Sequence, residues 1–399
     1  MRTTDWLIVG NGVVGATTAC LLADAGFSVT LLDTQPRPLP TSEDWDLKTY
    51  SLTPASRRIL RAIGVWSRLD PARVAPYDRM AVWEQGEEAG ITFDAAANAR
   101  PALGYMLEQS RLLGALHAAL GARPSIERVA GTPAALESAD DALELLTTDA
   151  RRWRARAIAA CDGGDSPLRV LAGIDCEILA YPQTAVVANV ETALPHQATA
   201  RQCFLPTGPL AFLPLPPANT CAIVWSTTPA EAADAVNADD ASFCASLGRA
   251  FGHRLGAVLK TSPRLALPLV RRHARRYSEG RVVLVGDAAH GVHPLAGQGL
   301  NLGLLDAAVL AEQAAAAGHA GLVEPQALFR RYERQRRGEV LAMLSATDRL
   351  NRLFLYHSPW AGRLRRAGLR LTDRIDPLKR CLMAYAMGDV GDLPRLARP

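Results

Sequence analysis

The chain has 399 residues, of which 49% are hydrophobic and 21% are charged, and its formal net charge is +4. These proportions are typical of globular proteins and exclude a disordered, collagen-like or disulfide-scaffold chain. The small net charge gives no support for nucleic-acid binding. No apolar run approaches the roughly 18 residues of a membrane-spanning helix. Residues 1–5 show no signal-peptide core, and the seven cysteines form no CxxC pair, which together predict a cytoplasmic protein with reduced thiols.

A glycine-rich turn follows the first predicted strand. Residues 6–9 are an apolar run, residues 10–15 read Gly-Asn-Gly-Val-Val-Gly, residues 16–25 have helical composition, and a second apolar run over 27–32 ends at Asp33. The three glycines suit a tight turn, a close approach of the backbone to a pyrophosphate, and close packing of the helix on the strand. The acid can accept hydrogen bonds from a ribose diol. The pattern predicts a dinucleotide site made by Gly10, Gly12, Val13, Val14, Gly15 and Asp33, without separating FAD from NAD.

A second strand ends in an acid much later in the chain. Residues 281–285 read Arg-Val-Val-Leu-Val and are predicted to form a buried strand, Gly286 and Asp287 follow, and an Ala/Leu-rich helix is predicted over 303–317. This segment resembles the second FAD signature of flavoprotein monooxygenases of the para-hydroxybenzoate hydroxylase type. The resemblance implies that Asp287 binds the ribityl and pyrophosphate part of FAD.

The residues between this acid and the helix fit a flavin ring. Gly297 and Gly299 flank Gln298 at a predicted helix start, where free N–H groups can stabilise the negative charge of reduced flavin. Pro294 has a fixed φ and can wall the reacting face of the ring. We therefore predict that Pro294, Gly297 and Gln298 position the flavin face, and we assign no general base. The predicted FAD contacts of this segment are Gly286, Asp287, Pro294, Gly297, Gly299, Leu300 and Asn301.

Two histidines in the same segment raise the alternative of a metal site. His290 and His293 form an HxxH pattern, but no third ligand cluster accompanies it, and the flanking glycines favour a flavin.

A third motif lies between the first two. Residues 156–161 are strand-like, Asp162 and Gly163 follow, and Ser166 before a proline predicts the N-cap of a helix. The segment resembles the Asp-Gly motif of the same family, which implies that Asp162, Gly163 and Arg169 serve FAD and NAD(P)H binding. A plain strand–turn–helix is the alternative.

Further segments narrow the resemblance. They lie at residues 46–52, 80–83, 107–109, 181–183, 208–215, 347–354 and 384–388. Together they resemble the ubiquinone-biosynthesis hydroxylases, from residue 5 to about residue 388. In two places the chain departs from that family: Lys48 stands where the family has Arg, which loses a planar fork, and Gln109 stands where the family has Asn. Related hydroxylases place an Arg or Gln at the position of Gln109 on the FAD, so we predict FAD contacts for both residues.

The resemblance implies a chemistry. NADPH or NADH reduces FAD in a transient encounter, O2 adds at C4a of the reduced flavin, and the hydroperoxide passes oxygen to the ring of a polyprenylated phenol. It also implies a ubiquinone-biosynthesis complex as a partner. Two alternatives stay open: a flavin-binding scaffold with little activity of its own, and a hydroxylase of another aromatic metabolite. A flavin halogenase is disfavoured because no two of the seven tryptophans are two residues apart.

The predicted fold is α/β. A Rossmann-like FAD-binding domain of the para-hydroxybenzoate hydroxylase type comprises residues 1–75, 101–179 and 271–340. A mixed β-sheet substrate domain comprises 76–100 and 180–270, and a helical segment follows over 341–399. Residues 212–214 are predicted to supply an apolar pocket wall, with plain core packing open for each side chain.

The C-terminal segment is basic. Residues 349–380 contain nine Lys and Arg against two Asp. Helical spacing separates an apolar face from a basic one, and their members are Trp360, Leu364, Ala367, Leu371, Ile375, Arg363, Arg366, Arg370 and Arg374. A solvated outer face is one interpretation. The other is contact with anionic lipid or a partner protein, which would place the protein at the inner membrane face.

Overall fold

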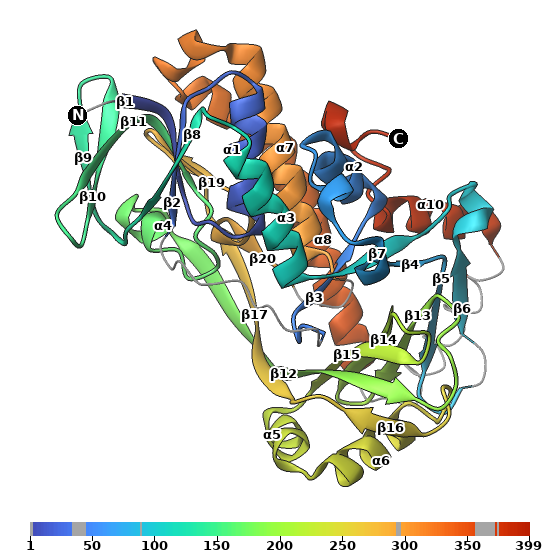
Figure 1. The fold of residues 1–399 in the computed structure, drawn as a ribbon. Coiled ribbons are helices and arrows are strands. Elements are labelled where there is room, and N and C mark those ends of the chain that lie inside the picture. The colour runs from blue at the N-terminus through green and yellow to red at the C-terminus, as the bar shows by residue number, and fades with distance from the viewer. Residues whose placement is uncertain (1–2, 34–44, 88–89, 293–296, 356–371, 373–374) are drawn as a thin grey trace.

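The computed structural model describes residues 3–33, 45–87, 90–292, 297–355, 372 and 375–399 (Figure 1). Within these ranges no helix is long and apolar enough to cross a bilayer.

The first sheet contains the parallel strands that end in the predicted motifs. Its order is β18-β19-β11-β1-β2-β8, and a β9–β10 hairpin joins it through β11. The bounds are β1 (Thr3–Val9), β2 (Val29–Asp33), β8 (Ile126–Ala130), β9 (Pro133–Ala139), β10 (Ala142–Thr147), β11 (Arg152–Ala160), β18 (Ser278–Glu279) and β19 (Val282–Leu284). Because β1, β11 and β19 are parallel neighbours, with Val9 beside Ala160 and Ala160 beside Leu284, the three motifs begin at one edge of the sheet.

Helices pack against this sheet. Helix α1 contacts both α3 and α7, and α8 packs on α7 (Figure 1). The bounds are α1 (Val13–Asp24), α2 (Pro54–Ala62), α3 (Gln109–Gly121), α4 (Pro167–Leu171), α7 (Gly299–Ala317) and α8 (Gln326–Leu355). The core between them contains an apolar cluster that includes Trp6, Phe27 and Phe329. Helix α7 begins at Gly299, as the glycines predict, with Gln298 at the N-cap position but no side-chain capping bond, and it extends the 303–317 helix toward the N-terminus.

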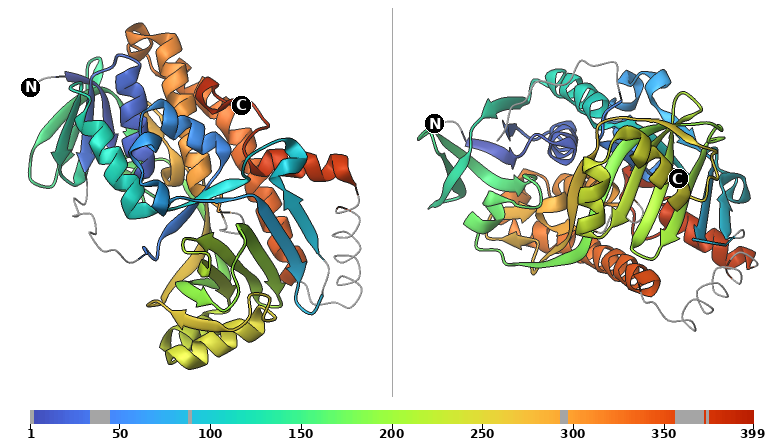
Figure 2. Two further views of the ribbon diagram at one scale, coloured as in Figure 1. Left: turned by 45° about the vertical axis from the view of Figure 1, so that its right-hand side comes forward. Right: turned by 90° about the horizontal axis from the view of Figure 1, so that it is seen from below.

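The second sheet is mixed and lies beside the first (Figure 2). Its order is β20-β17-β12-β15-β14-β13-β5-β6, with β16 on β12, and α5 and α6 cover one of its faces. The bounds are β5 (Arg79–Glu84), β6 (Ile91–Asp94), β12 (Cys176–Thr192), β13 (Thr199–Leu205), β14 (Gly208–Leu215), β15 (Thr220–Thr227), β16 (Val258–Thr261), β17 (Leu265–Ala274), β20 (His290–Gly291), α5 (Pro229–Asn237) and α6 (Asp240–Ala250).

A small sheet lies between the two large ones. It has the order β3-β7-β4, with bounds β3 (Thr49–Leu52), β4 (Ala75–Tyr77) and β7 (Gly104–Glu108). Helix α10 (Asp376–Ala386) packs near the β5–β6 hairpin (Figure 2). Short 3-10 helices lie at Trp66–Arg68, Pro71–Arg73, Ala95–Asn98, Gly286–Ala288, His319–Leu322 and Arg395–Ala397.

The division into domains stays a prediction, and the boundary at residue 341 falls inside α8. Most of the predicted amphipathic helix over 360–375 lies outside the described residues.

Candidate functional site

The β1–α1 turn requires two of its three glycines for packing. A Cβ on Gly10, which has φ +105°, would lie 2.4 Å from the Cys161 carbonyl oxygen. A Cβ on Gly15 would lie 1.9 Å from the Gly10 carbonyl oxygen. Gly12 is different, because no described atom comes within 4 Å of its Cβ position. The N-terminus of α1 therefore faces open space, where its N–H groups suit a pyrophosphate.

Asp33 is held at the end of β2 by a residue that the sequence analysis missed. Asn11 Nδ2 donates to Asp33 Oδ2 at 3.0 Å and lies 3.2 Å from His117 Nε2. Burial lowers the pKa of His117, which favours the neutral ring. Asn11 Oδ1 is buried and has no partner among the described residues, so it is a ready acceptor for a ribose hydroxyl. The position of Asn11 between two motif glycines was the available signal.

The first and second motifs meet at Val14. A Cβ on Gly286 would lie 3.2 Å from Val14 Cγ1, and a Cβ on Gly303 would lie 2.7 Å from Val14 Cγ2. The Val14 side chain of α1 thus packs against two glycines, one in the turn after β19 and one in helix α7, so the three elements lie close together. This close packing brings Asp287 to the same sheet edge as the N-terminus of α1.

The Asp287 side chain is reached by solvent although protein atoms surround it closely. Its side chain is exposed. Nevertheless, the surrounding protein raises its pKa by desolvation, while His290, Lys48 and Arg272 act in the opposite direction. A carboxylate that is reached by solvent yet surrounded by protein is what a recessed site for a polar ligand requires.

Lys48 and Gln109 lie near this acid, and their contacts with FAD stay a prediction. The Lys48 carbonyl accepts from the Gln109 N–H at 3.0 Å, and Tyr50 donates its hydroxyl to Gln109 Oε1 at 2.9 Å. Lys48 Nζ lies 5.9 Å from the centre of the Tyr50 ring. Burial and the negative charge of Asp287 raise the pKa of Tyr50, so its hydroxyl stays protonated and donates. Lys48 is thus one of the cations near Asp287.

The buried carboxylate of Glu108 holds the segment that carries Asp46 and Lys48. Arg73 donates from Nε and Nη2 to Glu108 at 2.8 and 2.6 Å, and Glu108 Oε1 also accepts from the Asp46 N–H at 3.0 Å. The Asp46 carboxylate accepts from the Ser110 N–H at 2.7 Å. Sequence reasoning missed Arg73, because the ion pair links positions 35 residues apart.

Residues of the third motif, 162–169, contact the turn of the second motif, which carries Asp287. Asp162 Oδ2 accepts from the Leu168 N–H at 3.0 Å, whereas its Oδ1 is buried and unpartnered within the described chain. Ser166 is the N-cap of α4, as predicted. Arg169 is buried and donates from Nη1 to the Ala288 carbonyl at 2.8 Å. Arg169 therefore positions the turn that carries Asp287, and its direct contact with a cofactor stays a prediction.

The start of α7 is rigid but uncapped. Asn301 is buried; its Oδ1 accepts from the Thr53 N–H at 2.9 Å, and its Nδ2 donates to the Ser51 carbonyl at 2.8 Å. Gln298 directs its Nε2 to the Ala386 carbonyl at 3.4 Å and does not cap the helix. Gly297 has φ +60°. The first N–H groups of α7, at Gly299 and Leu300, receive no side-chain cap from the described residues. Pro294 and His293 lie outside the described residues.

A buried charge network stabilises the same turn. His290 Nε2 lies 2.6 Å from Asp306 Oδ2, Arg336 Nε donates to Asp306 Oδ1 at 2.7 Å, and the Gly286 N–H donates to Oδ2 at 3.1 Å. Burial alone would raise the pKa of Asp306, but His290 and Arg336 hold it at about 2. His290 is thus engaged by a carboxylate, and the described residues contain no cluster of three metal-ligating side chains.

Side chains alternate between the two faces of the sheet along β14, so the residues of the predicted apolar wall do not all point to the same side. Phe212 faces α6 and stacks on Phe251 with ring centroids 3.9 Å apart, which is the core-packing alternative for this side chain. Leu213 points to the other side and packs in a cluster that includes half-buried Trp45 and Tyr77. This cluster joins β14 to β4 and β7, on the side of the sheet opposite α6.

These features fit FAD. The chain offers open space at Gly12, unpartnered oxygens on Asn11 and Asp162, an exposed Asp287 and an uncapped α7. Between them they match the ribose, the pyrophosphate and the pyrimidine edge of a flavin dinucleotide.

Comparison with known proteins agrees with this geometry. Residues 3–347 match a family model described as a FAD binding domain. The chain is 38% identical over its whole length to ubiquinone hydroxylase UbiL of Rhodospirillum rubrum, covering 93% of that protein. It is 36% identical over 96% of its length to 3-demethoxyubiquinol 3-hydroxylase of Escherichia coli, covering 98% of that protein.

Solved structures share the fold. The p-nitrophenol 4-monooxygenase PnpA of Pseudomonas putida superposes with a TM-score of 0.78 at 22% identity, over 98% of this chain and 100% of that one. PqsL of Pseudomonas aeruginosa superposes with a TM-score of 0.78 at 24% identity, over 93% of this chain and 100% of that one.

Proposed function

We propose, from the premise that this chain belongs to the family of FAD-dependent monooxygenases, that it hydroxylates the aromatic ring of a polyprenylated quinone precursor in ubiquinone biosynthesis. The names of its relatives support this substrate class, and the chain covers at least 93% of the first two of them. Their names differ in the ring chemistry that they specify, so the proposal is limited to the class.

The observation that carries the proposal is the meeting of two motifs about 270 residues apart in the chain. Val14 packs on Gly286 and Gly303, which places the N-terminus of α1 and Asp287 at one sheet edge. The apolar cluster of Leu213, Trp45 and Tyr77 adjoins β7, whose last residue, Glu108, anchors the Lys48 loop. The polar residues around Asp287 thus have an apolar, partly aromatic neighbour.

Each part of the chain has a task in this reaction. Asn11 and Asp33 hold the adenosine ribose, and the N-termini of α1 and α7 offer N–H groups to the pyrophosphate and to the flavin. FAD, when bound, supplies oxygen activation and oxygen transfer. The cluster around Leu213 excludes water from the reacting ring, which limits the wasteful release of hydrogen peroxide. No side chain is required as a general base.

We further propose NADPH or NADH as a reductant that docks transiently. The chain contains one Gly-x-Gly-x-x-Gly turn in a strand–helix context, and the FAD site uses it. O2 is the second substrate.

The test begins with purified protein. We expect a yellow preparation with FAD bound, oxygen uptake that depends on a prenylated phenol, and a product with one added oxygen. Expression in bacterial strains that each lack one ring hydroxylase of ubiquinone synthesis should restore ubiquinone in one of them. A yellow protein that forms no product and complements no strain would support a flavin-binding scaffold instead.

A further inference from the structure

Two hydroxyl groups lie together at the edge of the apolar cluster around Leu213. The Tyr77 hydroxyl oxygen, at the end of β4, is 2.8 Å from Ser51 Oγ on β3, and both side chains are half-buried. This contact uses one of the two hydroxyl protons. The other proton has no acceptor among the described residues, so it can be donated to a ligand. We call these two groups the hydroxyl pair.

Ser51 places the hydroxyl pair next to the start of α7. A Cβ on Gly297 would lie 3.2 Å from Ser51 Cβ. Asn301 holds the two segments together, because its Nδ2 donates to the Ser51 carbonyl at 2.8 Å and to the Gly297 carbonyl at 3.0 Å. The hydroxyl pair therefore adjoins the helix end at which we expect the flavin ring to bind.

Tyr77 places the hydroxyl pair beside the apolar wall of the site. Its ring packs in the cluster that includes Leu213 and Met106, and also in a second cluster that includes Phe93. Gly104 on β7 lets the ring lie against the backbone, because a Cβ there would be 2.4 Å from the Tyr77 hydroxyl oxygen. The ring is thus fixed, and its hydroxyl has a defined position between the wall and the start of α7.

The chemistry of the hydroxyl pair suits an uncharged acceptor. Burial raises the pKa of Tyr77 above its ordinary value, although the Ser51 hydrogen bond acts in the opposite direction, so the phenol stays protonated at neutral pH. A donor in apolar surroundings favours a ligand that satisfies it, because an unpaired polar group costs free energy. A flat apolar ring that carries one oxygen meets both requirements.

We propose that the hydroxyl pair of Tyr77 and Ser51 donates a hydrogen bond to the ring oxygen of a phenolic substrate and so fixes which edge of the ring faces the flavin. The substrate class rests on the proposed function. What the inference adds is the recognition of one oxygen atom by two named side chains.

The experiment compares two ligands on the FAD-loaded protein by equilibrium dialysis. One is a short-chain 2-prenylphenol, and the other is the prenylbenzene with the same chain and no hydroxyl group. Wild-type protein should bind the phenol roughly tenfold more tightly, because a site built for a hydrogen bond rejects the ligand that lacks it. Tyr77→Phe should reduce this preference to about twofold or less, and Ser51→Ala should reduce it in part. A merely structural defect would weaken both ligands equally and leave the ratio unchanged.

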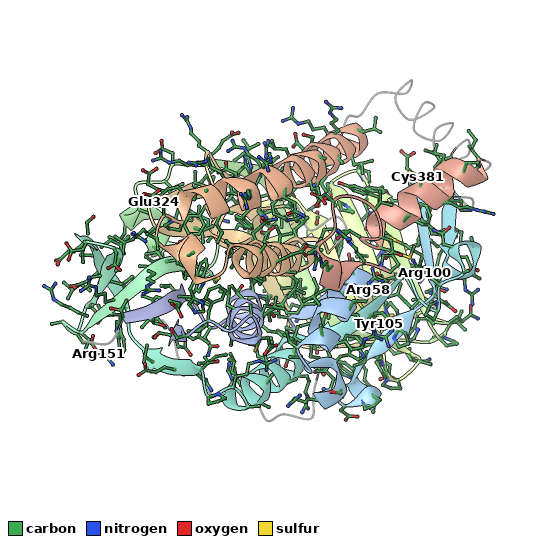
Figure 3. The ribbon with its side chains drawn as sticks, turned by 90° about the horizontal axis from the view of Figure 1, so that it is seen from above. Arg58, Arg100, Tyr105, Arg151, Glu324 and Cys381 are labelled. Carbon is green, nitrogen blue, oxygen red and sulfur yellow. The ribbon has the colours of Figure 1, made fainter. Side chains whose placement is uncertain are left out.

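Tyr105→Phe is the matched control. It removes a hydroxyl from another tyrosine of the same small sheet, where Tyr105 accepts a hydrogen bond from Arg57 Nη1 of α2 at 2.8 Å. Figure 3 labels Tyr105 in the region of α2, which also carries Arg58. This variant should keep the wild-type preference for the phenol.

Two results would overturn the inference: equal binding of both ligands by wild type, or a Tyr77→Phe variant that keeps the wild-type preference. If that variant keeps the preference and its FAD dissociation constant rises instead, the hydroxyl pair belongs to the flavin. Failure of the proposed function looks different, because wild type then binds neither ligand and hydroxylates no prenylated phenol, which overturns both. Failure of this inference alone leaves hydroxylation by wild type intact.

Discussion

The two large sheets of this protein carry their functional residues in different ways. In the first sheet, the residues expected to bind the cofactor lie where parallel strands end. They are backbone groups, glycines and an acidic residue, as at Gly12 and Asp287. In the second sheet, function lies on one face of the strands, where alternate side chains such as Leu213 point to the site and Phe212 points away. A strand end is contiguous in sequence, whereas a sheet face is assembled from many strands.

The largest expected effect on stability distinguishes Gly15, which is required for packing, from Gly12, which we expect to face FAD. Gly15→Ala places a Cβ 1.9 Å from a backbone oxygen that cannot move, so we expect the unfolding free energy to fall by more than about 3 kcal/mol. Gly12→Ala meets no described atom, so the protein without FAD should keep its stability. Its FAD dissociation constant should nevertheless rise roughly tenfold, or about 1.4 kcal/mol. Chemical denaturation and FAD titration of both variants measure this, and equal stability losses would contradict the assignment.

Disruption of the buried ion-pair network around Asp306 should give the next largest loss of stability. Asp306→Asn removes one of the two carboxylates that pair with the buried Arg336 guanidinium, while Glu339 remains paired with it, and we expect a loss of about 3 kcal/mol. Because the folded pKa of Asp306 is depressed to about 2, its contribution is complete above its unfolded pKa, near 4, and is lost as pH falls toward 2. The difference in unfolding free energy between wild type and variant should therefore shrink over that interval. A difference that stays constant with pH would contradict the charge assignment.

Substitutions at two neighbouring residues of β14 test whether their side chains point to opposite faces of the sheet. Phe212→Ala removes a ring stacked on Phe251 and should cost about 3 kcal/mol of stability with little change in KM. Leu213→Ala should cost much less stability but raise KM for a prenylated phenol severalfold, because it opens the wall of the site. Thermal unfolding and steady-state oxygen uptake check the pair, and a reversed order would place the substrate on the α6 side of the sheet.

The smallest effect concerns Lys48. Its positive charge lowers the pKa of Asp287, so Lys48→Met should raise that pKa and move the acid limb of FAD binding to higher pH. At neutral pH we expect a roughly threefold weaker FAD affinity, which is typical of a solvated charge pair. Lys48→Arg keeps the charge and serves as control. FAD titrations across pH measure both, and identical profiles for Met and Arg would remove Lys48 from the site.

The sequence by itself determined the parts of the protein whose physics is local. Strand, glycine turn and helix are consecutive at residues 6–25, and the Ser166 cap needs only its own first turn, so both were predictable. The same holds for the positions of Asp33 and Asp287, because Asp33 is the last residue of β2 and Asp287 lies three residues after the end of β19.

Only the tertiary structure decided which distant side chains meet. The pairing of Arg73 with Glu108 and the contact of Asp306 with His290 and Arg336 join residues without a periodic signal between them. An amphipathic pattern shows that a helix has an apolar face, but burial of Met383 and exposure of Leu382 depend on what packs against it. Long-range packing, which no single segment encodes, therefore decided how the cofactor recess, its apolar wall and the outer surface are arranged.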